Sequence, residues 1–261
     1  MIQQLGLQLY TLRNCFIDED FIDLSFRRMA ALGYTEAQTA GMPVCTPDRF
    51  IALAHKHGIR FVGTHYDFGK ILNEPEKTME LHRLWGTTNI GIGGMPGEAR
   101  TSLSALRDFI RTFNKTAEMY AKHGFRLTYH NHHFEFLRID GTRTLMDILA
   151  DELDPATTSF VLDTCWVAAG GGDVRAWLEK LAGRVDILHL KDMQLVRDGD
   201  KLVATMTEIG NGTLYWPGIL ETAEKIGVKH YVVEQDDHFL DGNPFRSIEV
   251  SAAALAPYRA K

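Results

Sequence analysis

Short apolar runs alternate along the chain with longer stretches in which apolar residues recur every three to four positions. The first pattern predicts buried strands and the second predicts amphipathic helices. The first pair is a strand at 5–10 and a helix at 18–32, which ends at Gly33, the residue type that commonly terminates helices. Seven more pairs follow. Their strands are predicted at 34–38, 59–65, 88–93, 125–132, 158–163, 184–191 and 229–234, and their helices at 46–57, 74–85, 102–123, 142–153, 173–181, 216–226 and 244–258.

Eight strand-then-helix units predict an α/β fold, a single (β/α)8 TIM barrel, because each connection is long enough to return the chain for parallel pairing. The length of 261 residues is close to the usual size of this barrel. No linker, low-complexity tract or repeated sequence divides the chain, so we expect one domain over residues 1–261. The pair Asp198-Gly199 predicts a small hairpin after the seventh strand.

The composition argues against several classes of partner. A net charge of −6 and a pI near 6.0 disfavour nucleic acid and membrane surfaces, because binding to such anionic partners relies on clustered Lys and Arg. We expect no targeting or membrane-spanning segment. The three cysteines are widely separated, which indicates neither a disulfide framework nor a cysteine zinc site. We therefore expect reduced thiols in a cytoplasmic protein.

The densest group of reactive side chains lies at 127–136, where three imidazoles and a carboxylate follow an apolar strand. Such groups are costly to bury unless each has a proton, a partner or a metal ion. The carboxyl ends of barrel strands meet at one rim, where the active sites of this fold lie. The predicted strands bring these candidate side chains to that rim: His65, His130, His132, Glu135, Asp163, His189, Lys191, Glu234 and Asp236.

Carboxylates and imidazoles without a thiolate suit a divalent metal ion. We favour Mn²⁺ and keep Co²⁺, Mg²⁺ and Zn²⁺ as alternatives. Three ligands are expected at the ends of three consecutive strands: Asp163, His189 and Glu234. The fourth is expected from the neighbouring strand-five segment, which offers three candidates: His130, His132 and Glu135. The residues alone leave the choice among these three open.

Several motifs resemble the xylose isomerase-like barrel superfamily of sugar isomerases, epimerases and keto-sugar lyases, which also contains inosose dehydratase. The resemblance extends over nearly the whole chain. The motifs are Gly33-Tyr34, Tyr129-His130-Asn131-His132 with Glu135-Phe136, Leu162-Asp163-Thr164, His189-Leu190-Lys191-Asp192, Ile209-Gly210-Asn211-Gly212 and Val233-Glu234-Gln235-Asp236. The resemblance implies a Glu, Asp, His, Glu ligand set on strands five to eight, and Asp163, His189 and Glu234 match the last three.

The sequence departs from the family pattern at three positions. His130 stands where the strand-five glutamate is expected, so either His130 or Glu135 is implied as the remaining ligand. Gln38 stands where a strand-two glutamate is frequent, and Trp166 stands where many relatives have a histidine. These differences weaken the case for an epimerase with two metal-bound glutamates.

A divalent ion that holds a carbonyl and an adjacent hydroxyl stabilises the enediolate formed when a proton is removed next to the carbonyl. We therefore predict a metal-dependent isomerase or epimerase acting on a small-molecule sugar or keto-sugar. The alternative is elimination by a lyase or dehydratase of the 3-keto-glycoside or inosose type. The expected acid, base and oxyanion groups are His132, Glu135 and Lys191. The expected substrate contacts are His65, Asn131, Trp166 and Asp236.

Two more distant classes remain. An AP-endonuclease-like barrel resembles this chain at 163–165 and 169–170, but that family implies three metal ions and further histidine ligands, and Trp166 removes one of them. Net acidity also disfavours a DNA-binding face. A non-catalytic sugar-binding barrel is the other class, and it would keep its ligand affinity without metal. Assembly into a homo-oligomer is implied by the resemblance alone.

Overall fold

The computed structural model describes residues 1–41 and 44–260. Eight parallel strands close into a barrel in the order β1-β10-β7-β6-β5-β4-β3-β2. The barrel strands are β1 (Leu5–Gln8), β2 (Glu36–Ala40), β3 (Arg60–His65), β4 (Asn89–Ile92), β5 (Arg126–His130), β6 (Thr158–Asp163), β7 (Val185–Leu190) and β10 (His230–Val233). The predicted (β/α)8 barrel is confirmed.

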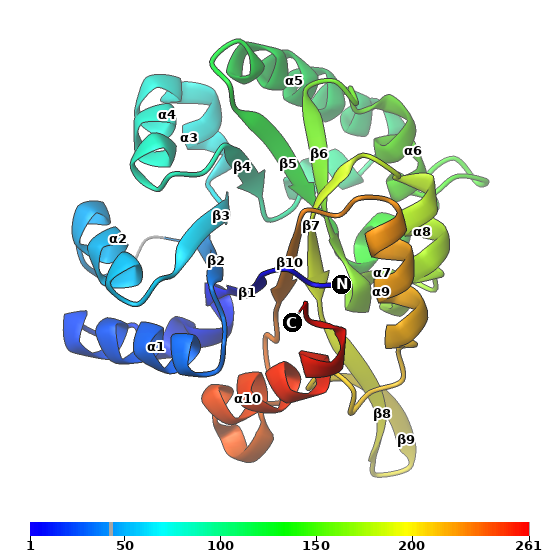
Figure 1. The fold of residues 1–261 in the computed structure, drawn as a ribbon. Helices are drawn as coiled ribbons and strands as arrows, with labels where there is room; N and C mark the ends of the chain where they lie inside the picture. Colours follow the sequence, from blue (N-terminus) through cyan, green and yellow to red (C-terminus); the bar gives the residue numbers. More distant parts are fainter. Residues whose placement is uncertain (42–43, 261) are drawn as a thin grey trace.

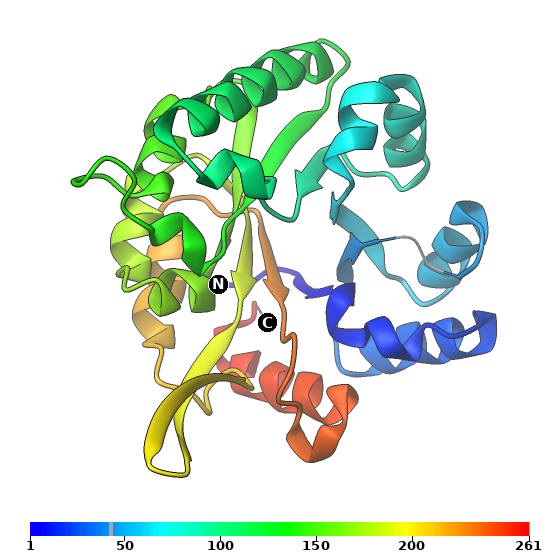
Figure 2. The same ribbon diagram turned by 180° about the vertical axis from the view of Figure 1, so that it is seen from behind.

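Helices surround the barrel and connect its successive strands (Figures 1 and 2). The α-helices are α1 (Glu19–Ala31), α2 (Pro47–Lys56), α3 (Phe68–Asn73), α4 (Pro75–Leu84), α5 (Leu103–Ala121), α6 (Leu145–Glu152), α7 (Thr164–Ala169), α8 (Val174–Lys180), α9 (Trp216–Lys225) and α10 (Pro244–Leu255). The 3-10 turns are η1 (Leu9–Cys15), η2 (Gly97–Arg100), η3 (His133–Phe136), η4 (Leu240–Gly242) and η5 (Ala256–Tyr258). The two ends of the chain lie side by side, since Ile2 pairs with Arg259.

The strands are apolar on both faces because one face fills the barrel and the other packs against the helices. Every residue of β6 and β7 is buried. Inside the barrel a separate cluster of buried side chains comes from four strands: Val62, Val161, Ile187 and Val232. The interior is therefore a packed core, and only the carboxyl ends of the strands are free to carry polar chemistry.

Three local features differ from the sequence prediction. The first strand ends at Gln8, whose side chain accepts a hydrogen bond from the Tyr10 N–H and caps the turn η1. The short helix α7 directly follows β6, because the Asp163 carboxylate accepts the Trp166 N–H as an N-cap. The short helix α3 precedes α4, with Asp67 as its N-cap.

A hairpin of two seven-residue strands, β8 (Asp192–Asp198) and β9 (Lys201–Thr207), extends from the carboxyl end of β7. It projects beyond the ring of helices in Figures 1 and 2. The turn lies at the predicted Asp-Gly position, since Asp198 pairs with Lys201. The hairpin is longer than the sequence suggested, because the strands continue on both sides of this turn.

The base of the hairpin is joined to the loop 209–214 through Asp192. The Asp192 carboxylate accepts hydrogen bonds from the N–H groups of Gly210, Gly212 and Leu214 and from the Trp216 indole. A Cβ at residue 212 would lie 2.2 Å from an Asp192 oxygen, so only glycine fits there. Two of the family motifs therefore form one structural unit that holds the chain after Lys191.

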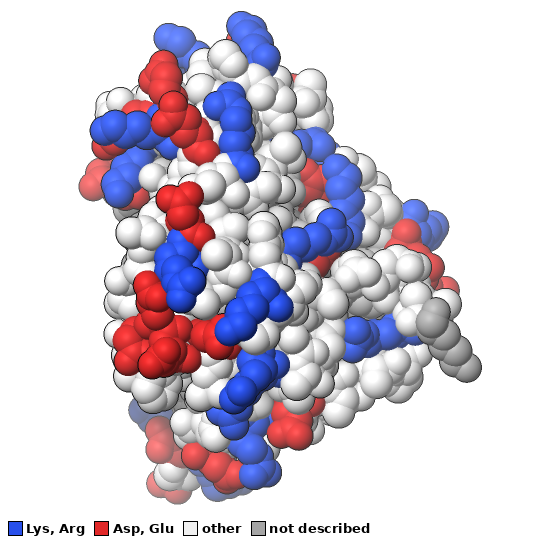
Figure 3. All heavy atoms as spheres, turned by 60° about the vertical axis from the view of Figure 1, so that its left-hand side comes forward, with Lys and Arg blue, Asp and Glu red and all other residues white. Residues whose placement is uncertain are grey.

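The outer surface carries charges of both signs. In Figure 3 basic and acidic side chains are interspersed over the face that includes the first helices. Ion pairs such as Arg49–Glu19 and Lys56–Asp23 join neighbouring helices on this side. Within residues 1–41 and 44–260, no helix has both the length and the apolarity required to cross a membrane.

Candidate metal centre

Four buried side chains converge at the carboxyl end of the barrel. They come from four neighbouring strands and their ends: His130, Asp163, His189 and Glu234, with one ligand atom of each within 4.8 Å of the others. The strand register explains this, because Asp163 pairs directly with His189, and Val233 next to Glu234 pairs with Leu190 next to His189. Side chains from β5, β6, β7 and β10 thus reach the same level of the rim.

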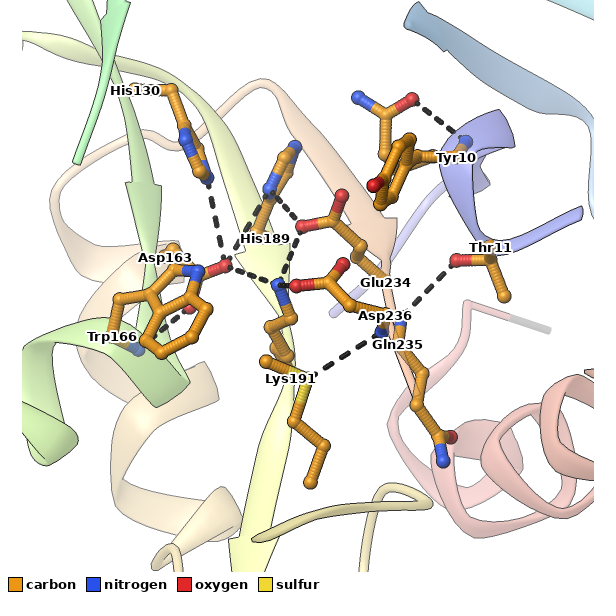
Figure 4. Close-up of polar contacts among 12 residues, drawn as sticks. Tyr10, Thr11, His130, Asp163, Trp166, His189, Lys191, Glu234, Gln235 and Asp236 are labelled. Carbon is orange, nitrogen blue, oxygen red and sulfur yellow. Dashed lines mark hydrogen bonds and ion pairs between the residues drawn. The ribbon is translucent and has the colours of Figure 1, made fainter. Parts of the chain in front are cut away.

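The distances within this cluster leave room for a cation (Figure 4). His130 Nε2 lies 3.6 Å from Asp163 Oδ2, and His189 Nδ1 lies 3.7 Å from the same oxygen. His189 Nδ1 and Glu234 Oε2 are 3.0 Å apart, yet their alignment does not make a hydrogen bond. Both ring nitrogens of His130, Asp163 Oδ2 and His189 Nδ1 are buried without a hydrogen-bond partner.

This pattern fits a metal ion. Buried polar atoms without partners cost free energy, and a cation among them would satisfy one nitrogen of each imidazole together with the Asp163 oxygen. Two imidazoles and two carboxylates form a mixed nitrogen and oxygen donor set of the kind used by divalent transition metals. The cluster is therefore a candidate metal site by its donor chemistry and by its unsatisfied atoms.

Lys191 lies beside the cluster with its side chain buried. Its ammonium Nζ is 2.7 Å from Asp236 Oδ2, 3.0 Å from Glu234 Oε2 and 3.4 Å from Asp163 Oδ2. Burial lowers the pKa of Lys191, but the three carboxylates outweigh burial and hold the pKa well above its ordinary value. The three carboxylates and the Lys191 ammonium together carry a net charge of −2, which a divalent cation would neutralise.

The pKa shifts in the cluster follow from these contacts. Burial raises the pKa of Asp163, but Lys191 and the imidazoles of His130 and His189 more than compensate, so the net pKa is lowered. Burial also raises the pKa of Glu234, but Lys191 and His189 outweigh burial and hold this pKa well below its usual range. Burial lowers the pKa of His189, whereas Glu234 and Asp163 raise it to about 9. Without metal, a proton on His189 therefore takes the place of a cation.

His65 approaches the cluster from β3. Its ring centroid lies 4.7 Å from that of His130 and 5.4 Å from that of His189, and its Nε2 has no partner. His65, His130 and His189 also form a second group whose ligand atoms lie within 4.8 Å. Burial and the neighbouring imidazoles His130 and His189 lower the pKa of His65 well below its ordinary value. His65 is thus a neutral ring at the centre of the rim.

The segment after β5 separates the three strand-five candidates. His130 belongs to the four-residue cluster, whereas Glu135 folds back within its own turn. Glu135 accepts a hydrogen bond from the Tyr129 hydroxyl at 2.6 Å and from the His132 N–H at 2.8 Å. Burial raises the pKa of Glu135 to about 7, although Tyr129 and the His132 N–H partly oppose the rise. Both carboxylate oxygens of Glu135 are therefore engaged away from the cluster.

His132 and Asn131 point in different directions from this segment. The His132 ring stacks on Phe134 with centroids 5.0 Å apart and lies 5.6 Å from Trp166. Burial and the nearby His130 lower the pKa of His132 to about 3. Asn131 is fully buried, and its Oδ1 accepts a hydrogen bond from the Asp163 N–H at 2.9 Å. Asn131 thus holds the backbone of Asp163, a member of the candidate cluster.

A cavity of about 310 Å³ opens above the cluster. Its wall includes seven of the predicted site residues, together with Tyr10, Ala40 and Gly93: His65, His130, His132, Trp166, Lys191, Glu234 and Asp236. Burial and the nearby Glu234 raise the pKa of Asp236 to about 6, against the opposing effect of Lys191. The cavity is large enough for a small-molecule ligand.

Two glutamines beneath the cluster were not assigned to the site from the sequence. Gln38 Oε1 accepts hydrogen bonds from Gln8 Nε2 at 3.0 Å and from His189 Nε2 at 2.5 Å. Both glutamines are fully buried. Buried amides in adjacent strands of a barrel rim are a usable signal, because each must find a partner inside.

The chain belongs to the xylose isomerase-like TIM barrel family, whose model matches residues 20–255. No curated protein matches the sequence. The chain is similar in structure to a sugar phosphate isomerase/epimerase from Parabacteroides distasonis ATCC 8503, with 23% sequence identity, a TM-score of 0.80, and 99% of this chain and 96% of that chain covered.

Two other solved structures carry the same fold. The probable 3-DHS dehydratase AsbF from Bacillus anthracis is 15% identical, with a TM-score of 0.72 over 97% of this chain and 98% of that chain. The IOLI protein with a bound zinc atom is 12% identical, with a TM-score of 0.72 over 98% of this chain and 97% of that chain. At these identities the likeness shows the fold.

Proposed function

We propose that this protein is a divalent-metal-dependent sugar isomerase or epimerase that removes a proton next to a substrate carbonyl. One observation carries this proposal: four buried ligand atoms from His130, Asp163, His189 and Glu234 converge beneath a small-molecule cavity. The family match and the neighbour described as a sugar phosphate isomerase/epimerase support a carbohydrate substrate. The zinc atom in the IOLI structure supports a metal in a barrel of this type.

The four clustered residues would hold the ion, with His130 in place of a strand-five glutamate. Mn²⁺ is our first choice because the donor set mixes imidazole and carboxylate, and Co²⁺, Mg²⁺ and Zn²⁺ are the alternatives. When bound, a divalent ion supplies Lewis-acid stabilisation of negative charge on a carbonyl oxygen.

His132 is the group best placed to accept the proton. Its imidazole lines the cavity, is neutral because of burial, and has an Nδ1 atom without a hydrogen-bond partner. The Glu135 carboxylate holds the His132 N–H and thereby the turn that carries this ring. Because Glu135 is absent from the cavity wall, we assign it a positioning role. Proton transfer by a positioned side chain contributes about 10²–10⁴-fold to rate.

Lys191 is assigned to stabilise the oxyanion. Its ammonium lines the cavity and stays charged because three carboxylates surround it. A fixed charge in a buried site costs no reorganisation when the oxyanion develops. The Lys191 Nζ also lies 5.0 Å from the centre of the Trp166 ring. This contact holds both side chains on the same wall.

The remaining wall residues would contact the sugar. His65 Nε2, which can donate or accept, and the Trp166 Nε1–H, which donates, are buried without partners, so each can form a hydrogen bond with a sugar hydroxyl group. Asp236 borders the cavity and is 24% exposed at its side chain. Asn131 would act on the sugar indirectly, by holding Asp163.

Elimination is the second candidate, and one feature of the cavity favours it. Glu234 is the single glutamate in the cavity wall among the described residues, so a pair of glutamates on opposite faces of a sugar is not formed there. One neutral base and one leaving group suffice for a keto-sugar lyase or dehydratase. The neighbour described as a dehydratase is consistent with this chemistry.

Product analysis separates the two candidates. Mn²⁺-loaded protein is incubated with free ketohexoses and with 3-keto-glucosides, and the products are identified by chromatography and mass spectrometry. Interconversion of sugars supports the isomerase or epimerase. Release of the aglycone without sugar interconversion replaces it with the lyase. Ligand affinity that survives complete removal of metal, without any turnover, would instead indicate a sugar-binding barrel.

A further inference from the structure

A second, largely apolar cavity of about 140 Å³ adjoins the first one. Trp166 lines both cavities, so the two share a wall. One side of the second cavity is formed by α7, which contributes Cys165 and Ala169, and the opposite side by the β8–β9 hairpin, which contributes Met193, Ala204 and Met206. The hairpin is an addition to the barrel, and this cavity is where it meets the rim.

The loop after β10 contributes consecutive residues to the walls of the two cavities. Asp236 lines the first cavity, and the next two residues, Asp237 and His238, line the second. His238 has a φ of 52°, a left-handed conformation that is unfavourable for a residue with a side chain. The buried amide of Gln235 holds this conformation by donating to the carbonyls of Asp237 and His238 at 3.0 and 3.1 Å. The hydrogen bonds of Gln235 therefore fix the backbone on one side of the second cavity.

Methionine side chains give this cavity an adaptable apolar lining. Met206 is buried, and its sulfur accepts the Asp236 N–H at 3.4 Å, which ties it to the rim of the first cavity. Met193 faces it from the partner strand, since the two residues are paired across the hairpin. Polarizable thioethers make favourable contacts with aromatic rings. The volume is close to that of an engineered cavity of roughly 150 Å³ that accepts benzene.

A phosphate group has no matching charge in either cavity. Lys191 is the one lysine or arginine in their walls among the described residues, and three carboxylates already surround it. Arg13, beside Tyr10, donates to the backbone carbonyls of Tyr10 and Asp236. A dianion in either cavity would meet Asp236 or Asp237. The walls thus favour a neutral substrate.

We infer that the second cavity is a substrate subsite, and that the substrate is an unphosphorylated sugar carrying an apolar substituent, such as an aryl group. This inference rests on the proposed function for the sugar-binding cavity and adds the substrate class. The sugar ring occupies the polar cavity over the cluster, and the substituent passes Trp166 into the space between α7 and the hairpin. The hairpin and the strained loop shape this specificity.

The two methionines allow a test that needs no turnover. Protein with ¹³C-labelled methionine methyl groups is titrated with phenyl β-D-glucopyranoside, methyl β-D-glucopyranoside, phenol and glucose 6-phosphate, and the methyl signals are followed by NMR. Met29, Met79 and Met146 are buried in the main core and serve as internal references. We expect phenyl glucoside and phenol to shift the Met193 and Met206 signals. The phenyl glucoside should bind at least about 10-fold tighter than the methyl glucoside, as burial of a ring predicts.

Filling the cavity should abolish this preference. Ala204→Phe and Ala169→Phe add a ring from opposite walls, and Leu202→Phe adds one to the same strand outside the cavity. The first two variants should lose the phenyl preference and the Met193 shift, and the third should keep both. If phenol shifts the Met193 and Met206 methyl signals but the protein neither binds metal nor converts sugars, the subsite is supported and the proposed function is overturned. The subsite would be overturned if neither phenyl glucoside nor phenol moved the Met193 and Met206 signals. It would also be overturned if glucose 6-phosphate bound more tightly than phenyl glucoside.

Discussion

Gln38 accepts a hydrogen bond from Nε2 of His189, 2.5 Å away, deep beneath the candidate metal centre. The amide orientation is fixed because Gln8 also donates to the Gln38 oxygen, while Gln8 itself accepts from the Tyr10 N–H. Since an amide oxygen only accepts, His189 must carry a proton on Nε2, which leaves Nδ1 to face Asp163 and Glu234. The glutamine pair thus selects the His189 nitrogen that would serve as a ligand in the proposed metal site.

Replacing Gln38 should therefore weaken metal binding. Gln38→Leu removes the acceptor, and we expect a loss of about 10- to 100-fold in Mn²⁺ affinity, the usual effect of losing an outer partner of a ligand. Gln38→Glu keeps an acceptor at the same place and should bind at least as tightly as the wild type. Isothermal titration calorimetry on folded variants measures both. Equal affinity in Gln38→Leu and wild type would show that this contact does not tune His189.

The choice between His130 and Glu135 as the fourth ligand can be tested with two substitutions. His130→Ala removes a member of the cluster and should reduce Mn²⁺ affinity by more than the roughly 100-fold expected for an outer partner. Glu135→Gln should leave Mn²⁺ affinity nearly unchanged and reduce kcat, because the turn carrying His132 loses its carboxylate anchor. If Glu135→Gln lost much more Mn²⁺ affinity than His130→Ala, Glu135 rather than His130 would be the fourth ligand.

Lys191→Met removes the ammonium from among three carboxylates. We expect Mn²⁺ to bind more tightly, because the cluster becomes more negative, and kcat to fall by about 10²–10³-fold, as for other oxyanion donors. Lys229→Met is the matched control, since Lys229 pairs with the buried Asp186 and is absent from the cavity wall. A Lys191→Met enzyme with an unchanged kcat would leave Lys191 a purely structural ion-pair partner.

His82 should make the folded protein sensitive to acid. Its Nδ1–H donates to the Thr78 carbonyl, its Nε2 accepts from the Thr64 hydroxyl, and burial lowers its pKa to about 4. Between the ordinary pKa of 6.5 and this value, the unfolded chain binds a proton that the folded protein does not. The stability contribution of neutral His82 is complete above pH 6.5 and is lost as the pH falls to about 4.

The loss should amount to about 3 kcal/mol, at about 1.4 kcal/mol per pKa unit. Urea unfolding of the wild type and of His82→Gln at several pH values measures it as a difference, in which the effects of other groups cancel. The stability difference between the two proteins should shrink as the pH falls from 7 to 4. A difference independent of pH would mean that folding does not perturb His82.

The barrel could be predicted because its strands are short apolar runs separated by capped helices. The rim positions of Asp163, His189 and Glu234 could be predicted as well, since each one lies within one residue of the end of a strand. The strand-five member of the candidate cluster could not be chosen from the sequence. That choice depends on Glu135 folding back to Tyr129, a contact across a 3-10 turn that no periodic pattern encodes.

The hydrogen bonds of the two glutamines and the existence of the second cavity could not be predicted from the sequence. Gln8 and Gln38 lie on predicted strands, but their hydrogen bonds to each other and to His189 are set by the strand register. The cavity depends on the packing of α7, which was not predicted, against a hairpin whose length was underestimated. Both features are tertiary contacts between elements far apart in the chain.

Proton removal next to a carbonyl at the proposed His130, Asp163, His189 and Glu234 centre can be followed by exchange with solvent. Deuterium incorporation is detected by mass spectrometry when Mn²⁺-loaded protein interconverts ketohexoses in D2O, because reprotonation of the enediolate then uses solvent deuterium. We expect deuterium at the carbon next to the carbonyl with the wild type, and none with chelated protein or with Asp163→Asn. Conversion without deuterium, or incorporation that persists after chelation and in Asp163→Asn, would contradict proton removal at this centre.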